Sequence, residues 1–588
     1  MKGNSFVKLI ASSKKFLPRM ILVVLLCVVS VCLTVFGTGF LSDLTNIVDE
    51  AASADTSSVG DVLDMSVIEY YCVILLIMWT GAAVCNYVQA FLMAGVTQGV
   101  SKKLRGDLAL KTDRLPISYF DSRQTGDTLS RLTNDVDTVA QSLQNGLSTA
   151  LSAVVQLALV TVVMLLTNWQ MSLTAFATVP LSLLVMAFIV KVSQKYFRRQ
   201  QKELGAMNGT AEECYSAMEV VHSCNAQDAV KEKFSKRNDR MRSAQRKANI
   251  ISGISYPMTT FVSKLGYVAI CVVGGILMSQ GKTDLGTLAA FLLYISLFQT
   301  PLSQLGQIIT QFQQASAAAD RVFEYLEAEE QEDESGKETY LDPETVRGDV
   351  TFSDVCFGYT EDAPVIRNFS ASVKAGQKVA IVGPTGAGKT TLVNLLMRFY
   401  ETGAGIISVD GVPVSSLRRE NVREFCSMVL QDPWLFEGTV RENLVFSREG
   451  IPDEQLIRAE EDARIRPLIL SLPEGENAPV TDEGLSGGQK QLFTIARAML
   501  KDSPIMILDE ATSNVDTFTE REIQEAMDRL CSGRTSFVIA HRLSTIRNAD
   551  LILVLKDGNI VEQGKHEELL ALGGFYEKLY KSQFAGAG

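Results

Sequence analysis

Between Met20 and Ser101 the sequence contains no lysine and no arginine. This stretch coincides with apolar runs that are long enough to cross a bilayer, and such runs recur up to about residue 310. After about Arg321 the composition becomes that of a soluble α/β protein. Because 588 residues are also too many for a single core, we predict a transmembrane domain over 20–320 and a separate soluble domain.

Other scarce features exclude whole classes of function. The net charge is -12, and no strongly basic face is evident, which argues against nucleic acid as a partner. The ten cysteines form no CxxC pair and show no histidine spacing typical of a metal site. We interpret them as small apolar residues in a reduced setting.

The basic N-terminal segment resembles a signal peptide at first sight. The apolar run behind it, Met20–Leu41, is too long for that role and lacks a small-residue cleavage site. We therefore predict that residues 1–19 form an amphipathic interfacial helix on the inner leaflet, followed by the first span.

Six apolar runs can each cover a hydrocarbon core of roughly 30 Å. They are Met20–Leu41, Val67–Val96, Leu143–Leu166, Met171–Val192, Ile250–Met278 and Gly286–Ile309. The alternative, core helices of a large soluble protein, is disfavoured because six such runs in one half are difficult to bury in any other way.

Charges between the spans predict the orientation. The loop Ser42–Ser66 carries only acidic charges and is expected outside, whereas the segments 102–131 and 191–247 are rich in Lys and Arg and are expected in the cytoplasm with the N-terminus. Both basic segments have helical periodicity, so we predict helical extensions beyond the membrane. Their tips, near Pro116–Asp127 and Ala211–Val221, could contact a soluble domain.

The soluble half follows an acidic linker. We predict this linker over 321–345, because its stretch Glu327–Glu338 is highly charged and poor in apolar residues. Four short apolar strands then alternate with helical segments, namely "KVAIVG", "FCSMVLQ", "IMILDE" and "TSFVIAH". Such strands are typical of a parallel sheet covered by helices, so residues 346–588 are predicted to form an α/β domain.

The first of these strands leads into a phosphate-binding loop. The residues are Gly383, Pro384, Thr385, Gly386, Ala387, Gly388, Lys389, Thr390 and Thr391, which match GxxxxGK[ST] between a strand and an apolar helix. Backbone N–H groups would wrap the β-phosphate, Lys389 would reach the β and γ oxygens, and the Thr390 hydroxyl could bind Mg²⁺. A chance loop is the alternative, which this context disfavours.

A pair of acids ends the strand "IMILDE". Consecutive side chains on a strand point to opposite faces, so Asp509 and Glu510 cannot share a role. Asp509 fits a magnesium-holding function, and Glu510 is the candidate to orient or deprotonate the attacking water. The alternative for Glu510 is an acid that caps a helix.

The stretch "LSGGQKQ", Leu485–Gln491, places small residues before a predicted helix. The first N–H groups of a helix have no intrahelical partner and lie at the positive end of its dipole, which favours an anion. An ordinary glycine-rich loop is the alternative.

Taken in order, "CFGY", "GPTGAGKTT", "VLQDPWLF", "LSGGQKQ", "IMILDEATSNVD" and "IAHRLSTI" resemble the nucleotide-binding domain of an ABC transporter. The six spans with long cytoplasmic extensions resemble a half-transporter of the type IV exporter class, which handles drugs or lipids. This resemblance covers essentially the whole chain and implies a helical membrane domain fused to a P-loop NTPase domain.

The resemblance also implies roles for individual residues. Tyr359 would stack on adenine, Gln431 would contact Mg²⁺ and the attacking water, and His541 would reach the γ-phosphate. Ser486, Gly487, Gly488 and Gln489, with Asp516 of the D-loop, would contact ATP bound to the opposite domain of a dimer. ATP and Mg²⁺ are thus the expected ligands, and a second half-transporter is the expected partner.

Two departures from the family pattern bear on these expectations. The stretch before the signature is shorter than is usual in exporters, which leaves the course of the chain at Asp482 and Glu483 open. The D-loop sequence "SNVD" in place of "SALD" is a feature associated with heterodimeric bacterial exporters. We slightly favour a homodimer, with a heterodimer as the alternative.

The leading hypothesis is ATP-driven export of a hydrophobic or amphipathic drug, lipid or peptide across a bacterial cytoplasmic membrane by alternating access. An importer built on the same fold remains open, and an ATP-gated channel is disfavoured by the presence of Glu510 and His541. Lys264, in the fifth span, is predicted to face the translocation cavity. Its alternative is a lysine that extends to the membrane interface.

Overall fold

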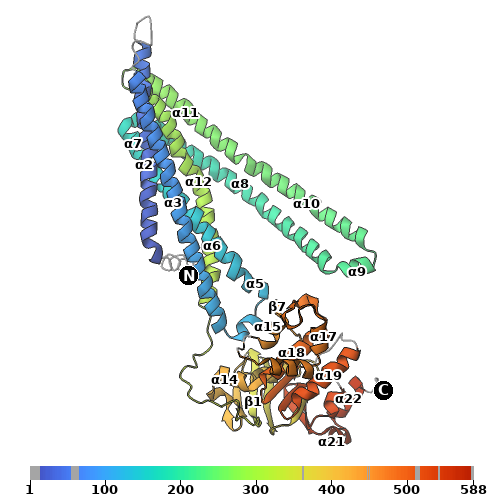
Figure 1. Ribbon diagram of the computed structural model, residues 1–588. Helices are drawn as coiled ribbons and strands as arrows, with labels where there is room; N and C mark the ends of the chain where they lie inside the picture. The colour runs from blue at the N-terminus through green and yellow to red at the C-terminus, as the bar shows by residue number, and fades with distance from the viewer. Residues whose placement is uncertain are drawn as a thin grey trace. The chain divides into compact units, whose positions relative to one another are not determined.

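The computed structural model describes residues 14–53, 65–360, 363–446, 448, 450–509, 517–540 and 543–584. The chain divides into two compact units (Figure 1). The helical unit comprises residues up to Asp113 together with Gln124–Ala328. The α/β unit comprises Arg114–Arg123 together with the chain from Glu329 onward.

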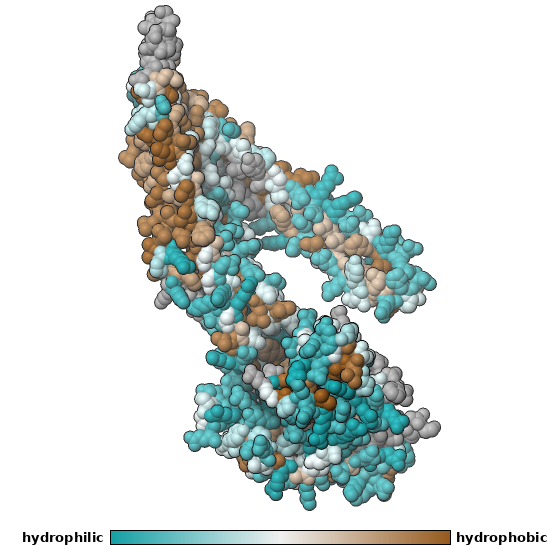
Figure 2. Space-filling model, viewed as in Figure 1, coloured by the Kyte–Doolittle hydropathy of each residue, from teal (hydrophilic) through white to brown (hydrophobic). Residues whose placement is uncertain are grey.

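Among the described residues, six helical stretches of the helical unit are long and apolar enough to cross a membrane, as predicted. The main helices are α2 (Leu17–Ser53), α3 (Met65–Arg114), α7 (Ser148–Thr167), α8 (Trp169–Ser216), α11 (Ser255–Ser279) and α12 (Leu285–Leu326). A short turn, η1 (Lys14–Phe16), precedes α2, and α5 (Thr125–Ser130), η3 (Arg131–Asp135), α6 (Val136–Ser142) and η4 (Leu143–Leu147) lead into α7. Figure 2 shows a hydrophobic surface along α2 and α3, which suits contact with lipid tails.

Helical extensions carry the chain beyond the apolar spans, also as predicted. The 48-residue helix α8 and its neighbour α10 (Gln227–Gly253) lie side by side and are joined by α9 (Met218–Ser223) (Figure 1). The break in the helix between α8 and α9 falls within the predicted tip at Ala211–Val221. At the other tip, α4 (Ile117–Asp121) separates α3 from α5.

Side-chain caps hold two short links between spans, the one from α7 to α8 and the one from α11 to α12. Asn168 alone separates α7 from α8, and its carboxamide oxygen accepts hydrogen bonds from the N–H groups of Gln170 and Met171. Asp284 caps α12 by accepting from Thr287 N–H and also accepts from Asn46 of α2. These caps allow the chain to reverse direction within a few residues.

The α/β unit contains two main sheets. A six-stranded sheet has the order β12-β11-β3-β10-β9-β6, and all of its pairings except β11 with β12 are parallel. Its strands are β3 (Lys378–Val382), β6 (Cys426–Val429), β9 (Ile505–Asp509), β10 (Thr535–Ile539), β11 (Leu551–Lys556) and β12 (Asn559–Gly564). The four predicted apolar strands are therefore confirmed as members of a parallel sheet.

The second sheet is antiparallel, and the sequence pattern did not predict it. Its order is β2-β1-β4-β5, formed by β1 (Val350–Thr360), β2 (Ala363–Val373), β4 (Ala404–Val409) and β5 (Val412–Pro413). A third, small sheet pairs β7 (Gly438–Thr439) with β8 (Pro479–Val480). Phe352, Phe369 and Phe537 pack edge-to-face and join the first two sheets in one core.

Helices connect the strands of the parallel sheet, and several of them pack against it. They are α13 (Lys389–Leu396), α14 (Arg419–Phe425), α15 (Val440–Val445), α16 (Asp453–Asp462), α17 (Arg466–Ser471), α18 (Gly487–Lys501), α19 (Thr517–Cys531), α20 (Leu543–Arg547), α21 (His566–Ala571) and α22 (Phe575–Phe584), with 3₁₀ turns η5 (Val414–Ser416), η6 (Gly475–Asn477) and η7 (Asp482–Gly484). The resulting order of strands and helices is the wound α/β arrangement that positions ligands at the carboxyl ends of strands.

The predicted linker is more ordered than its composition indicates. α12 continues through Leu326, so it includes the first residues of the predicted linker range. From Glu329 onward the chain belongs to the α/β unit, because its charged groups find partners there. Glu334, for example, accepts hydrogen bonds from Arg398 and from the N–H of Arg419, both at 2.6 Å.

Candidate functional site

The loop between β3 and α13 depends on its glycines. Gly388 has φ +98°, and a Cβ there would lie 2.7 Å from Cδ1 of Ile366. A Cβ at Gly383 would lie 2.4 Å from the carbonyl oxygen of Leu555. Gly386 has φ +82°, and a Cβ there would meet no atom within 4 Å, so its backbone borders open space. This arrangement suits a loop whose backbone approaches a ligand closely.

Lys389 begins α13 and bends back over the loop. Its Nζ donates to the carbonyl oxygens of Gly383 at 2.8 Å and Pro384 at 3.1 Å, and the residue is buried. Burial lowers the pKa of Lys389, while the Asp509 carboxylate acts in the opposite direction. A phosphate group would relieve this burial penalty, because it places negative charge beside the ammonium.

Asp509 is brought to the same edge of the sheet by strand pairing. It is the last residue of β9 and is buried, and it pairs in register with Ile539 of β10, which pairs in turn with Ile381 of β3. The carboxyl ends of these parallel strands therefore meet beside the loop. Thr390 is exposed in the first turn of α13 and supplies a hydroxyl. An acid, a hydroxyl and phosphate-binding amides are the donor set that Mg²⁺ with a nucleotide requires.

Aromatic side chains lie next to α13. Tyr359 of β1 is half exposed, and its hydroxyl lies 3.1 Å from Oγ1 of the buried Thr391. Its ring centroid lies 5.1 Å from those of Phe357 and Tyr400, in edge-on geometry. Tyr400 was not singled out from the sequence, and no local motif marks it. The exposed part of Tyr359 is available for stacking on a base.

A capping box begins helix α18 at Ser486. Ser486 caps the helix: its Oγ accepts from Gln489 N–H at 3.3 Å, and the Gln489 side chain accepts from Ser486 N–H at 3.0 Å. This capping box leaves the N–H groups of Gly487 and Gly488, at the first two helical positions, without intrahelical acceptors. A Cβ at Gly487 would meet no atom within 4 Å, so its amide is open to a ligand.

The shortened stretch before α18 has a defined course. β8 pairs with β7, and η7 then turns the chain toward Ser486. Asp482 accepts from the ammonium of Lys490 at 2.7 Å and from Leu435 N–H at 3.3 Å. These contacts fix Asp482 against α18 and complete the turn without additional residues.

The remaining residues that the sequence predicts for the site are not gathered at the phosphate loop in the part of the chain that the structure describes. Gln431 is exposed just after β6. Glu510, Asp516 and His541 lie outside the described residues, although Glu510 follows Asp509 directly in the sequence. Lys264 is exposed on α11, far along the chain from the phosphate loop.

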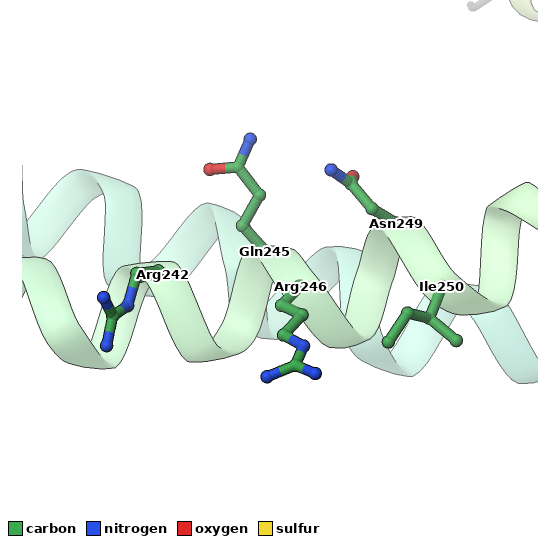
Figure 3. Close-up of a pocket in the computed structure, with 5 residues that line it drawn as sticks. All are labelled: Arg242, Gln245, Arg246, Asn249 and Ile250. Atoms are coloured by element: carbon green, nitrogen blue, oxygen red, sulfur yellow. The ribbon is translucent and has the colours of Figure 1, made fainter.

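A shallow depression lies along α10. It is lined by Arg242, Gln245, Arg246, Asn249 and Ile250. Figure 3 shows Gln245 and Asn249 on one side of the helix and the other three side chains on the opposite side. Because these polar groups do not converge on one point, the depression does not form a built binding site.

Comparisons with known proteins agree with the arrangement at the phosphate loop. The family model described as ABC transporter transmembrane region matches residues 20–302, and the one described as ABC transporter matches residues 366–513. A fatty acid ABC transporter ATP-binding/permease protein of Mycobacterium bovis is 42% identical over 525 residues, which cover 89% of this chain and 83% of that protein. The chain belongs to the ABC transporter family.

Further relatives include an ATP-dependent lipid A-core flippase of Syntrophus aciditrophicus, 35% identical over 502 residues, or 85% of this chain and 83% of the flippase. The transporter is an ATPase coupled to transport, with a multi-pass membrane domain and a cytoplasmic nucleotide-binding domain. Membrane and nucleotide-binding domains fused in one chain constitute a half-transporter, which acts as a dimer. The predicted family, fold class and activity are thus confirmed.

Proposed function

We propose that this transporter exports a lipid-like amphiphile from the inner side of a bacterial cytoplasmic membrane by alternating access of a dimer. The observation that carries the proposal is the complete phosphate loop beside Asp509, on a chain whose relatives include proteins named for fatty acids and for lipid A. A drug or an amphipathic peptide remains the alternative substrate class.

Each residue of the nucleotide site has a proposed role in ATP binding or hydrolysis. Amides of 383–391, with Lys389, bind the phosphates of ATP, and Tyr359 stacks on the adenine. Thr390, Asp509 and Gln431 would hold Mg²⁺, which neutralises charge on the phosphates. Glu510 accepts the proton of the attacking water, and Gln431 and His541 orient the water and the γ-phosphate.

The open amides before α18 complete the site of a second chain. In this proposal Ser486, Gly487, Gly488, Gln489 and Asp516 contact ATP held by the partner's loop. ATP binding therefore favours the closed pair of domains, and hydrolysis releases it. We favour two copies of this chain, for reasons taken up in the Discussion.

The proposed boundaries follow from the sequence and the two units. The predicted interfacial helix spans 1–19, but 1–13 lie outside the described residues and 17–19 already belong to α2, so its proposed end moves to about residue 16. Residues 20–320 carry the substrate path. The nucleotide-binding domain occupies 346–588. Lys264 faces the substrate path.

Direction of transport is the decisive test. Proteoliposomes with the nucleotide-binding domains outward receive ATP and a fluorescent fatty acid or phospholipid analogue in the outer leaflet. Export in the cell corresponds to ATP-dependent movement into the lumenal leaflet, with a Glu510→Gln variant as the inactive control. Movement in the opposite direction would establish an importer. Passive, ATP-gated flux of ions without lipid movement would establish a channel.

A further inference from the structure

A stripe of polar side chains runs along the exposed face of α12. Ser296, Thr300, Ser303 and Gln307 follow one another at spacings of four, three and four residues, which places them on one side of a helix, and all four are exposed. The exposed face of α3 is, in contrast, made of large apolar residues such as Leu76, Trp79 and Phe91. Thr300 and Ser303 donate their hydroxyl hydrogens to carbonyl oxygens of α12 itself, at 2.9 and 2.7 Å, which leaves their oxygens and the Gln307 carboxamide on the exposed face. A polar face of this kind within a span suits contact with water or with another polar surface better than contact with lipid tails.

Lys264 lies beside this stripe. Its ammonium lies 4.7 Å from the centroid of the Tyr267 ring, and the Tyr267 hydroxyl lies 2.9 Å from Oγ of Ser296. α11 and α12 are therefore joined at the position of the lysine. The side chain of Lys264 is exposed, so its donors are accessible to a ligand.

The sequences of the helices around Lys264 offer it no nearby carboxylate. Between residues 250 and 309 the sequence contains only one other basic residue, Lys282, and one acid, Asp284, both in the turn between α11 and α12. α8, which also packs against α11, has no Asp or Glu between residues 169 and 190. A lone cation inside a membrane is costly, and the aromatic ring of Tyr267 offsets this cost only in part.

An apolar surface adjoins the lysine on the other side. Leu265, Val268, Val272 and Ile276 are exposed along α11 at helical spacing. Lys264 thus stands at the border between a hydroxyl-lined polar face and an apolar face. A ligand with a charged head and a hydrocarbon tail complements both faces at once.

We propose that Lys264 and Tyr267, with the hydroxyl stripe of α12, form a headgroup site that selects amphiphiles carrying a carboxylate or a phosphate. The anion pairs with the ammonium, the hydroxyl pair of Tyr267 and Ser296 has one hydrogen left to donate to a headgroup oxygen, and the tail lies along the apolar side of α11. This assignment rests on the proposed function, since it requires that amphiphiles are transported.

The test compares amphiphiles that share one alkyl chain and differ in the headgroup. Carboxylate, phosphate, phosphocholine and trimethylammonium compounds are titrated onto the transporter in nanodiscs of zwitterionic lipid, and the concentration for half-maximal ATPase stimulation is measured. A charge-assisted contact predicts about tenfold lower values for the two anionic compounds than for the cationic one. The separate carboxylate and phosphate titrations distinguish fatty acid-like from phospholipid-like substrates.

Substitutions test whether Lys264 is the source of the preference for anionic headgroups. Lys264→Gln is expected to abolish the preference for anions, Lys264→Arg to retain it, and Lys264→Glu to reverse it toward the cationic compound. Lys282→Gln, which removes a charge of the same kind from the turn between α11 and α12, is expected to leave the preference as in the wild type. The readout is the ratio of the half-maximal concentrations for two headgroups, measured within one variant. A general loss of folded protein does not change this ratio.

Two outcomes would overturn the headgroup site. One is wild-type stimulation that does not depend on headgroup charge, and the other is a Lys264→Gln variant that keeps the wild-type ratio. Either result leaves amphiphile export intact. If no amphiphile of any charge stimulates the ATPase or moves across proteoliposome membranes, the proposed function itself fails.

Discussion

The hydroxyl of Tyr400 donates a hydrogen bond of 2.5 Å to the carboxylate of Asp121. Asp121 ends the short helix α4, and Tyr400 follows α13, so the bond joins the tip of a membrane helix extension to the core of the α/β unit. The Tyr400 ring packs edge-on against Tyr359, which we propose stacks on adenine. Burial raises the pKa of Tyr400, and the bond to Asp121 raises it further, which keeps the hydroxyl protonated as the donor.

Tyr400→Phe retains the aromatic packing and removes only this donor. We expect ATP binding to persist and the stimulation of ATPase activity by substrate to fall, because the contact between α4 and the nucleotide-binding domain weakens by about 1.5–3 kcal/mol, the range for a hydrogen bond to a charged group. Basal and stimulated ATPase rates are measured in the same nanodiscs.

Tyr340→Phe is the matched control, because its hydroxyl donates to Glu424 at 3.2 Å on the exposed surface. A combined Tyr400→Phe and Asp121→Ala variant should lose little more than either single variant, because each substitution removes the same hydrogen bond, Tyr400→Phe by deleting the donor and Asp121→Ala by deleting the acceptor. Fully additive losses, or equal effects of Tyr340→Phe, would show that the bond does not contribute to coupling.

Glu334 organises the segment that leads into the nucleotide-binding domain. It accepts from Arg398, from Arg419 N–H and from Lys337, and its side chain is only 11% exposed. Burial acts to raise the pKa of Glu334, but the bonds from Arg419 N–H, Lys337 and Arg398 outweigh it and hold the pKa below its ordinary value. The segment also contacts the residues before α4, because Gln331 donates to the carbonyl oxygens of Arg114 and Leu115.

This pKa predicts how stability depends on pH. A carboxyl group with a lowered pKa in the folded state contributes stability that is fully present above its unfolded pKa, about 4.3, and is lost as the pH falls through the folded value. Glu334→Gln should therefore lower the free energy of unfolding by about 1.5–3 kcal/mol near neutral pH, and by less as the solution becomes acidic. Thermal unfolding followed between neutral and acidic pH measures the difference.

Glu338→Gln provides the comparison, because Glu338 is exposed in the same segment. It is expected to change the unfolding temperature little at any pH. A constant difference between Glu334→Gln and wild type across the whole pH range would mean that the charge of Glu334 is not what stabilises the segment.

The sequence predicted those parts of the transporter that depend on local patterns. Apolar runs predicted six spans, and the motif around Lys389 predicted a strand, a loop and a helix in the right order. The contact of Tyr400 with Asp121 joins residues 279 positions apart, and nothing near either residue signals it. Glu334 lies in a stretch whose composition is typical of a flexible linker, but composition carries no information on distant partners such as Arg398.

Glu510 is the predicted base for hydrolysis, and its substitution tests the assignment. Glu510→Gln preserves shape but removes the group that accepts a proton, so ATP binding should persist while turnover falls by about 10²- to 10⁴-fold. Steady-state ATPase activity and retention of labelled ATP are measured together. The variant should accumulate as an ATP-bound closed dimer, and a rate within a few fold of wild type would exclude Glu510 as the base.

The composition of the dimer follows from which catalytic residues this chain retains. Lys389, Ser486, Glu510 and His541 are all present, so two copies could form two competent sites, whereas "SNVD" points to a heterodimer with a chain that lacks the catalytic glutamate. We expect the chain purified alone to be a dimer with vanadate-sensitive ATPase activity. Co-expressing a Lys389→Met chain with a Ser486→Arg chain should restore activity that neither has alone, because one site then combines an intact loop with an intact signature. An inactive or monomeric preparation that gains activity only with a different half-transporter would establish the heterodimer.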